Sequence, residues 1–296
     1  MKVPIAYLAV VIIWSTTPLG IVWSSETVQP AMAVMLRMAV AALLGTLLLI
    51  IFRIKLPLSA NARKLYTYST LGVYGGMMCG YFAASYVTSG FMSLVFGLSP
   101  IVSGLFAQKI LNEPAFDRSK IIAMIVCFLG LAIVCWDKLS LNSDSIIGIG
   151  LLLTAMTFFS LSAVMVKSVT INIHPLATTI GTLYFALPLF FITWLLSSGG
   201  QLHTELWSQR SLLAILYLGV FGSLIGFIAY FFVLQRLAAS TVALITLITP
   251  VFAIALGALF NNESISVKLI IGALLITLGL SIYFWGKRIL LQRKPL

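Results

Sequence analysis

Residues 93–114 of the chain read SLVFGLSPIVSGLFAQKILNEP, and residues 243–264 read ALITLITPVFAIALGALFNNES. At an offset of 150 positions, Pro100 matches Pro250, and Asn112-Glu113 matches Asn262-Glu263. Each stretch is an apolar segment of about the length of a membrane span, with a proline inside it and a polar pair at its end. Chance matching of apolar sequence would give one proline coincidence, but not this ordered series.

The match extends along both halves of the chain. After these stretches, at an offset of 149, the matching residues are Ala123, Gly130 and Trp136 with Gly272, Gly279 and Trp285. Before them, at an offset of 145, Ser15 and Pro30 match Ser160 and Pro175. We therefore predict two copies of a five-helix unit, residues 1–144 and 145–296. Because five is odd, the second copy enters the membrane from the opposite face, as in transporters with inverted repeats.

The composition places the chain in a membrane. It has 296 residues, of which 61% are hydrophobic and only 8% are charged, and its mean hydropathy is +1.12. A soluble domain has about 25% charged residues. This composition excludes an ordinary soluble enzyme and a disordered protein, and it indicates a polytopic membrane protein.

Apolar runs of about 20 residues, enough to cross the hydrocarbon core, recur along the chain. They predict an all-α integral membrane protein with ten transmembrane helices. The expected spans are 4–24, 30–52, 65–85, 89–111, 120–136, 146–166, 175–196, 211–234, 239–260 and 268–286.

Ten spans place the loops alternately on two sides, and lysine and arginine favour one of them. The side that holds both termini carries Lys2, Arg53, Lys55, Arg63, Lys64, Lys109, Arg118, Lys120, Lys167, Arg236, Lys287, Arg288, Arg293 and Lys294. The other side carries Lys138, Arg210 and Lys268. Since basic loops stay in the cytoplasm, we expect both termini to be cytoplasmic. The net charge of +11 then reflects topology, so no nucleic-acid partner is expected.

Two other features, a cleaved signal peptide and a site built from cysteines, fit the sequence less well. Lys2, an apolar run and Ala31-Met32-Ala33 resemble a cleaved signal peptide, but Pro30 belongs to the repeated pattern. The three cysteines lie inside apolar runs and have no metal-ligand spacing, so they are expected to be buried hydrophobes.

The marks of a known family are Trp14-Ser15, Arg37, the two proline stretches and the glycine-rich helices that follow them. Together they resemble the drug/metabolite transporter superfamily, and within it the bacterial ten-helix EamA-type transporters, over nearly the whole chain. Members often have Gly-Glu where this chain has Asn112-Glu113 and Asn262-Glu263. The resemblance implies a transporter of small metabolites that commonly exports amino acids or related compounds.

Several residues are expected at mid-membrane depth, where they could line a central, mostly aromatic cavity between the halves. These candidates are Trp14, Ser15, Tyr74, Met78, Phe96, Phe159, Ser160, Phe227, Tyr230 and Thr246. For each of them, packing against another helix or lipid is the competing interpretation.

Arg37 lies seven residues after Pro30, so it is expected ~10 Å inside the membrane. Two roles are open for it: its side chain snorkels to the interface, or it binds an anionic group such as a substrate carboxylate or lines an outer vestibule.

Pro100 and Pro250 each remove a backbone hydrogen bond in mid-helix, and this gives either a fixed kink or a hinge that flexes during transport.

Glu113 and Glu263 each lie at the end of one helix and just before the next helix. The unpaired amides at the N-terminus of that following helix would stabilise the carboxylate. A role in gating or proton coupling is the alternative. All seven acidic residues are expected in loops or at helix ends and none in the centre of a span, so a carboxylate relay is not predicted.

The sequence carries no phosphate-binding loop, no metal-ligand motif and no paired acids for catalysis. We therefore expect neither cofactor nor metal, and a secondary carrier working by alternating access in preference to a channel, a structural membrane protein or a membrane enzyme. Its expected partners are a small-molecule substrate and the bilayer, and the protein is expected to be a monomer or weak dimer.

Overall fold

The computed structural model describes residues 2–141, 145–237, 242 and 245–291, and their side chains except those of 137–141 and 287–291. Within these ranges every regular element is a helix, so the all-α prediction is confirmed. The predicted start of the ninth span at 239 and the predicted boundary between the halves at 144 lie outside the described residues.

The helices follow one another with short connections, and their bounds are as follows. They are α1 (Val3–Ser24), α2 (Pro30–Ile51), α3 (Ala60–Thr70), η1 (Leu71–Gly76), α4 (Met77–Ala83), α5 (Ser89–Phe96), α6 (Ser99–Ile110), α7 (Arg118–Leu141), α8 (Ser145–Lys167), α9 (Pro175–Ser198), η2 (Thr204–Leu206), α10 (Gln209–Tyr217), η3 (Leu218–Ile225), α11 (Gly226–Arg236), α13 (Ile245–Asn261) and α14 (Val267–Leu291).

The helices have the length and the surface of a membrane protein. In the described part of the chain, eight helical segments are long and apolar enough to cross a membrane, and α13 is a shorter apolar helix of 17 residues. The continuous helical segment 60–83, formed by α3, η1 and α4, is not among the eight, so the ten-span count stays a prediction. Leucines such as Leu43, Leu196 and Leu259 are 73%, 81% and 74% exposed, as expected where lipid replaces water.

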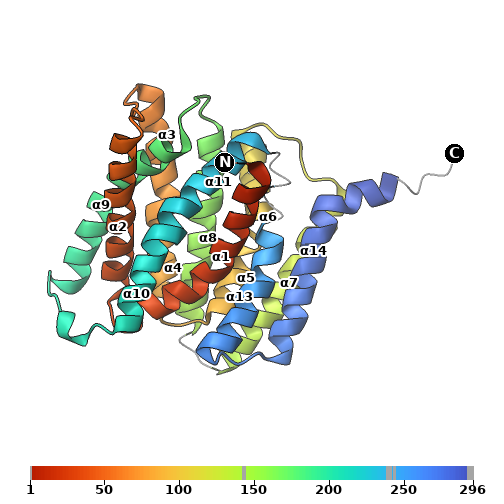
Figure 1. Cartoon of the computed structure of the whole chain (residues 1–296). Coiled ribbons are helices and arrows are strands. Elements are labelled where there is room, and N and C mark those ends of the chain that lie inside the picture. The colour runs from red at the N-terminus through yellow and green to blue at the C-terminus, as the bar shows by residue number, and fades with distance from the viewer. Residues whose placement is uncertain (1, 142–144, 238–241, 243–244, 292–296) are drawn as a thin grey trace.

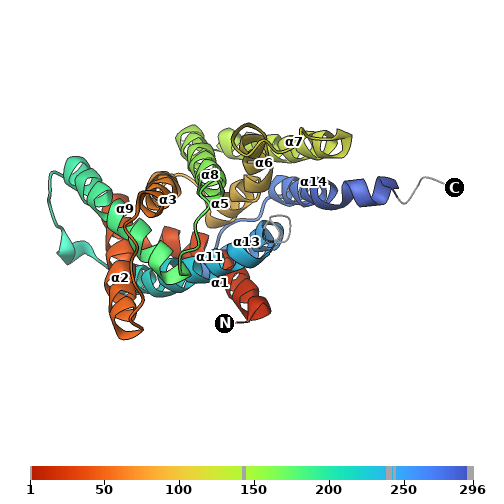
Figure 2. The same ribbon diagram turned by 90° about the horizontal axis from the view of Figure 1, so that it is seen from above.

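The helices form an elongated bundle (Figures 1 and 2). The contacting pair α2 and α9 lies at one end of its long axis, and the contacting pair α7 and α14 lies at the other. Between them, α1 packs against α11 and α13, while α8 packs against α4, η1 and α6. The start of α1 and the end of α14 lie toward the same edge of the bundle in Figure 1.

Glycine allows α7 and α14 to approach at backbone distance. A Cβ atom added at Gly272 would lie 2.8 Å from the carbonyl oxygen of Gly130 and would overlap the side chain of Val134. A Cβ at Gly130 would in turn lie 2.8 Å from the carbonyl oxygen of Gly272. Small residues at a helix interface permit such contact in membranes, where packing replaces the hydrophobic effect as the main attraction.

The two repeated prolines occupy different positions in their helices. Pro100 lies in the first turn of α6, after a break at Gly97-Leu98, rather than in mid-helix as predicted. Its missing N–H costs nothing there, because the first turn of a helix has no intrahelical acceptor for it. Pro250 lies inside α13, as predicted, and its Cγ would be 3.4 Å from a Cβ added at Gly97.

Two helical segments each contain a π-helical stretch: η1 lies between α3 and α4, and η3 lies between α10 and α11. Along the chain these are the third and the eighth long helical segments. Glycines occur in both stretches, and the neighbouring side chains occupy the space that they leave. Gly76 faces the ring of Phe159, and Gly222 faces the guanidinium of Arg37. π turns inside α-helices are frequent at functional sites, so these two segments direct attention to the residues packed on them.

Candidate functional site

The Asn-Glu pairs adopt the same turn at both helix ends. Asn112 and Asn262 have φ angles of 53° and 50°, in the left-handed region that glycine and then asparagine tolerate best. This turn lets the amide of Glu113 donate to the carbonyl of Ala107 (3.3 Å), and the amide of Glu263 donate to that of Gly257 (3.1 Å). Asparagine therefore takes the position where glycine most often ends a helix in a left-handed turn.

The carboxylate of Glu263 caps another helix. Its Oε1 accepts from the amide of Ser89 (3.0 Å) and its Oε2 from the amide of Gly90 (3.2 Å), at the start of α5. A Cβ at Gly257 would lie 2.5 Å from Oε2, so glycine makes the room for this contact. The capped helix is α5, not the following helix. Glu113, by contrast, is exposed and interacts electrostatically with Lys167.

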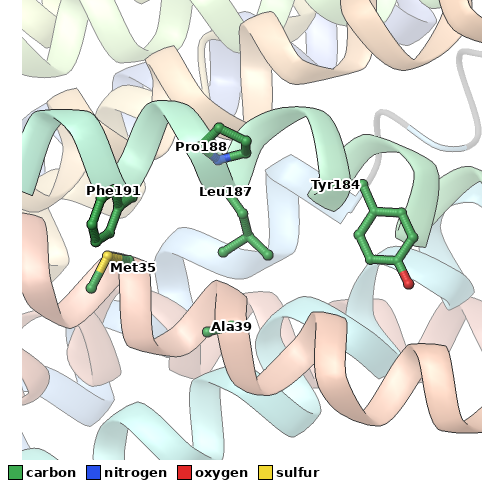
Figure 3. A pocket seen from close by; sticks show the side chains of 6 residues that line it. All are labelled: Met35, Ala39, Tyr184, Leu187, Pro188 and Phe191. Atoms are coloured by element: carbon green, nitrogen blue, oxygen red, sulfur yellow. The ribbon is translucent and has the colours of Figure 1, made fainter.

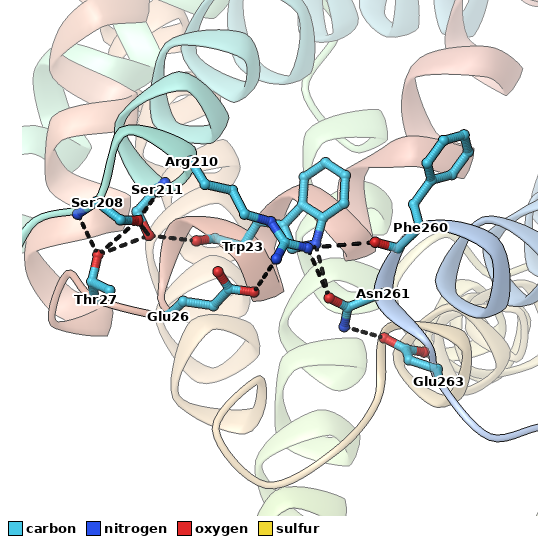
Figure 4. Close-up of polar contacts among 9 residues, drawn as sticks. All are labelled: Trp23, Glu26, Thr27, Ser208, Arg210, Ser211, Phe260, Asn261 and Glu263. Atoms are coloured by element: carbon cyan, nitrogen blue, oxygen red, sulfur yellow. Dashed lines mark hydrogen bonds and ion pairs between the residues drawn. The ribbon is translucent and has the colours of Figure 1, made fainter.

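A polar cluster around Arg210 joins α1, α10 and α13 next to this cap (Figure 4). The guanidinium of Arg210 lies 4.4 Å over the ring of Trp23, and its Nη1 lies 3.4 Å from Glu26 Oε1. The Oδ1 atom of Asn261 accepts from Arg210 Nη2 (3.0 Å) and from Trp23 Nε1 (2.9 Å). Asn261 Nδ2 then donates to Glu263 Oε1 (3.2 Å), which connects this Arg210 cluster to α5.

Hydroxyl groups extend the Arg210 cluster along the junction of α1 and α10. Ser211 Oγ donates to the carbonyl of Trp23 (2.7 Å), and Thr27 Oγ1 accepts from the amide of Ser208 (2.9 Å). The cluster thus fastens three helices at the end of the bundle opposite to the start of α1. Its members Trp23, Glu26, Arg210 and Asn261 were not singled out from the sequence, because only the fold brings residues so far apart in the chain together.

Arg37 does not snorkel to the surface. Its side chain is 0% exposed and points into the bundle, where Nε donates to Ser223 Oγ (2.8 Å) and Nη1 to Tyr81 Oη (3.5 Å). Its Nη2 is buried without a hydrogen-bond partner among the described residues. Ser24 Oγ donates to Tyr81 Oη (3.5 Å) and follows Trp23 in the chain, so Tyr81 connects Arg37 to the end of α1 that carries the Arg210 cluster.

Four of the six aromatic cavity candidates form two contact pairs. Trp14 of α1 packs on Tyr230 of α11 with ring centroids 5.0 Å apart, and Phe96 of α5 packs on Phe159 of α8 at 5.7 Å. Tyr74 faces the periphery instead, because its hydroxyl bonds Thr193 of α9 at 2.6 Å.

The remaining candidates are mostly buried. Ser15 Oγ donates to its own helix at Val11 O (2.7 Å), whereas Ser160 Oγ donates across to Ser99 O (3.3 Å), beside the break between α5 and α6. Met78 and Phe227 are each 7% exposed. The carbonyl oxygen of Thr246 would lie 3.4 Å from a Cβ at Gly97.

Two hollows are found elsewhere, along the crossing of α2 and α9 (Figure 3). The first has a volume of about 460 Å³ and is lined by Met35, Ala39, Tyr184, Leu187, Pro188 and Phe191. The second adjoins it and shares Ala39, Tyr184 and Leu187. None of the ten cavity candidates lines either hollow. Their open, apolar lining on the outside of the bundle suits lipid chains rather than a polar substrate.

No group of three or more potential metal ligands is found in the part of the chain that the structure describes. The polar groups described above instead gather around two arginines, Arg210 at the end of the bundle and Arg37 in its interior.

The comparisons with known proteins agree with this architecture. The model of the EamA-like transporter family matches residues 1–136 and again 146–285. An uncharacterized transporter of Archaeoglobus fulgidus is 25% identical over 95% of this chain and 98% of its own length. The protein PagO of Salmonella typhimurium is 24% identical, over 90% of this chain and 87% of its own.

A further relative and one solved structure extend the comparison. The protein PecM of Dickeya dadantii is 24% identical over 96% of this chain and 93% of its own. A crystal structure matches at a TM-score of 0.68 and 17% identity, over 97% of this chain and 98% of that one, which shows a shared fold. Since the family model covers nearly all of both halves, the chain belongs to the EamA-like transporter family of membrane transporters.

Proposed function

We propose that the protein is a secondary transporter that moves small metabolites, amino acids or related compounds, out of the cell by alternating access. In this proposal the halves 1–144 and 145–296 are inverted five-helix repeats around a central aromatic site, in a bacterial inner membrane with both termini cytoplasmic. Family membership supports transport itself.

One observation carries the alternating-access proposal: corresponding structural devices occur in both halves. Each half has a π-helical stretch in its third helical segment and a left-handed Asn-Glu turn after its proline helix. The family model also matches the two halves separately. Two similar units in opposite orientation can exchange conformations, and this exchange presents one site to each side in turn.

Purified protein in liposomes tests the proposal through counterflow. We expect saturable exchange of at least one metabolite from a panel of amino acids and their carboxylate and amide analogues. A flux that rises linearly with concentration for every compound would indicate a channel or no transport. Comparing external metabolites of cells with and without the gene would test the direction of transport.

The proline of α13 gives the first prediction. If Pro250 is a hinge, Pro250→Ala restores a backbone hydrogen bond, stiffens α13 and slows transport about tenfold while substrate binding changes by less than about twofold. Transport rate in liposomes and ligand-induced stabilisation measure the two effects separately. Pro188→Ala, in the peripheral helix α9, is the matched control and is expected to leave the rate unchanged. Equal losses of rate and binding in Pro250→Ala would contradict the hinge.

The paired serines give the second prediction. Ser15→Leu and Ser160→Leu are expected to lower transport at least about tenfold while the protein still inserts, because each adds bulk at a buried position near the proposed cavity. Thr154→Leu changes an exposed residue of α8 and serves as the control. Unchanged transport in both serine variants would remove these residues from the site.

A further inference from the structure

Arg37 is a buried charge for which the described residues provide no counter-charge. A guanidinium keeps its positive charge when buried, and removing it from water is costly unless an anion and hydrogen bonds compensate. The two groups that bind it, Ser223 Oγ and Tyr81 Oη, are neutral, and Nη2 has no partner. The residue therefore has one charge and one donor position to offer to a ligand.

The acidic residues with described side chains are engaged or located elsewhere. Glu26 pairs with Arg210, Glu205 with His203, and Glu263 caps α5. Glu113 and Asp117 follow α6, which ends toward the edge of the bundle where α1 begins (Figure 1). A balancing negative charge must therefore come from outside this part of the chain.

Three hydrogen-bond donors converge at Arg37. Ser223 and Tyr81 accept its N–H groups, so their own hydroxyl protons remain available to donate. With Nη2 they form a donor set suited to the two oxygens of a carboxylate, in which the bond from Nη2 is charge-assisted. Gly222 keeps η3 close, since a Cβ there would lie 2.9 Å from Nη2. Ser24, the chain neighbour of Trp23, donates to Tyr81, so access to this site would come from the end of the bundle that carries the Arg210 cluster.

We propose that Arg37, Tyr81 and Ser223 bind the carboxylate of a monoanionic substrate, an organic acid without an α-ammonium group. This inference rests on the proposed transport function and narrows it. A monoanion neutralises the buried charge, whereas a zwitterion leaves the site with a net charge of +1 and adds an ammonium. No described acidic side chain adjoins Arg37 to bind that ammonium.

Matched compounds test the class of substrate on the wild-type protein. The probes are propionate, propionamide and alanine, and the larger set 3-phenylpropionate, 3-phenylpropanamide and phenylalanine. Each set compares an acid with its neutral amide and with its zwitterion. We expect the acid of at least one set to stabilise the purified protein against heat and to drive counterflow at least about tenfold better than its amide and its zwitterion.

Variants assign the effect to the site. Tyr81→Phe and Ser223→Ala each remove one hydroxyl and are expected to weaken binding of the acid about tenfold, while the fold persists. Arg37→Lys keeps the charge but loses the planar guanidinium that contacts Ser223, Tyr81 and the ligand together, and it is expected to weaken binding further. Arg63→Gln, at an exposed arginine of α3, is the control and should bind as the wild type does.

The outcomes separate the inference from the transport proposal. Saturable transport of alanine or phenylalanine without preference for the acids would overturn the inference and leave the transporter intact. Absence of saturable transport for all probes, with no stabilisation, would count against both. Preference for the acids that persists unchanged in Tyr81→Phe, Ser223→Ala and Arg37→Lys would show that they bind elsewhere.

Discussion

Gly272→Val is expected to lower the free energy of unfolding by about 3 kcal/mol, because the new side chain meets backbone that cannot move aside. The added Cβ would lie 2.8 Å from the carbonyl oxygen of Gly130, so α7 and α14 must separate along their whole contact. Thermal unfolding in detergent, followed by tryptophan fluorescence, measures the loss.

Gly150→Val is the matched control for this substitution. Nothing lies within 4 Å of a Cβ added at Gly150 in α8, so the same chemical change should leave stability nearly unchanged or raise it slightly. Equal melting temperatures for Gly272→Val and the wild type would mean that α7 and α14 are not held at backbone distance.

Glu263→Gln is expected to loosen the end of the bundle that the Arg210 cluster fastens. Glutamine offers one acceptor oxygen in place of two, so one of the amides of Ser89 and Gly90 loses its partner, along with the favourable charge at the start of α5. A loss of about 1.4 kcal/mol raises the open population about tenfold.

Cysteine labelling measures this opening. In a variant without Cys79, Cys127 and Cys135, Ser24→Cys places a thiol at a position that is 0% exposed behind the cluster. In detergent-solubilised protein, maleimide should label it about tenfold faster when Glu263→Gln is added. Glu205→Gln, at an exposed position of η2, should not change the rate. The same rate in both backgrounds would show that Glu263 does not hold this end closed.

The repeated stretches predicted helices because their signals are local in the chain. The repeat also paired Asn112 with Asn262, and the structure shows what the two share, a left-handed turn that the sequence analysis did not predict. The position of Pro100 differed for a local reason as well. Gly97 and Leu98 break the helix one turn earlier, so the proline begins α6 instead of bending a longer helix.

Whether a mid-membrane side chain points toward lipid or toward the interior of the bundle could not be predicted in the same way. Lipid and protein interior are both apolar, so sequence gives the depth of a residue in a span but not the direction of its side chain. Tyr74 illustrates this, since its depth suited a central cavity while its hydroxyl bonds the peripheral α9. Trp23, Asn261 and Arg210 meet only because the ends of α1 and α13 lie beside the start of α10.

The buried, unpaired guanidinium of Arg37 has an electrical consequence. When a monoanion moves outward across a membrane that is negative inside, its free energy falls by about 2.3 kcal/mol per 100 mV, without any coupled ion. Bound to Arg37, it would cross as a neutral pair, so the potential would act instead on the return of the empty carrier. That return carries the positive guanidinium inward, in the direction the potential favours, by the fraction of the field that the side chain crosses. The membrane potential would then set the speed of the cycle at the step where no cargo is present.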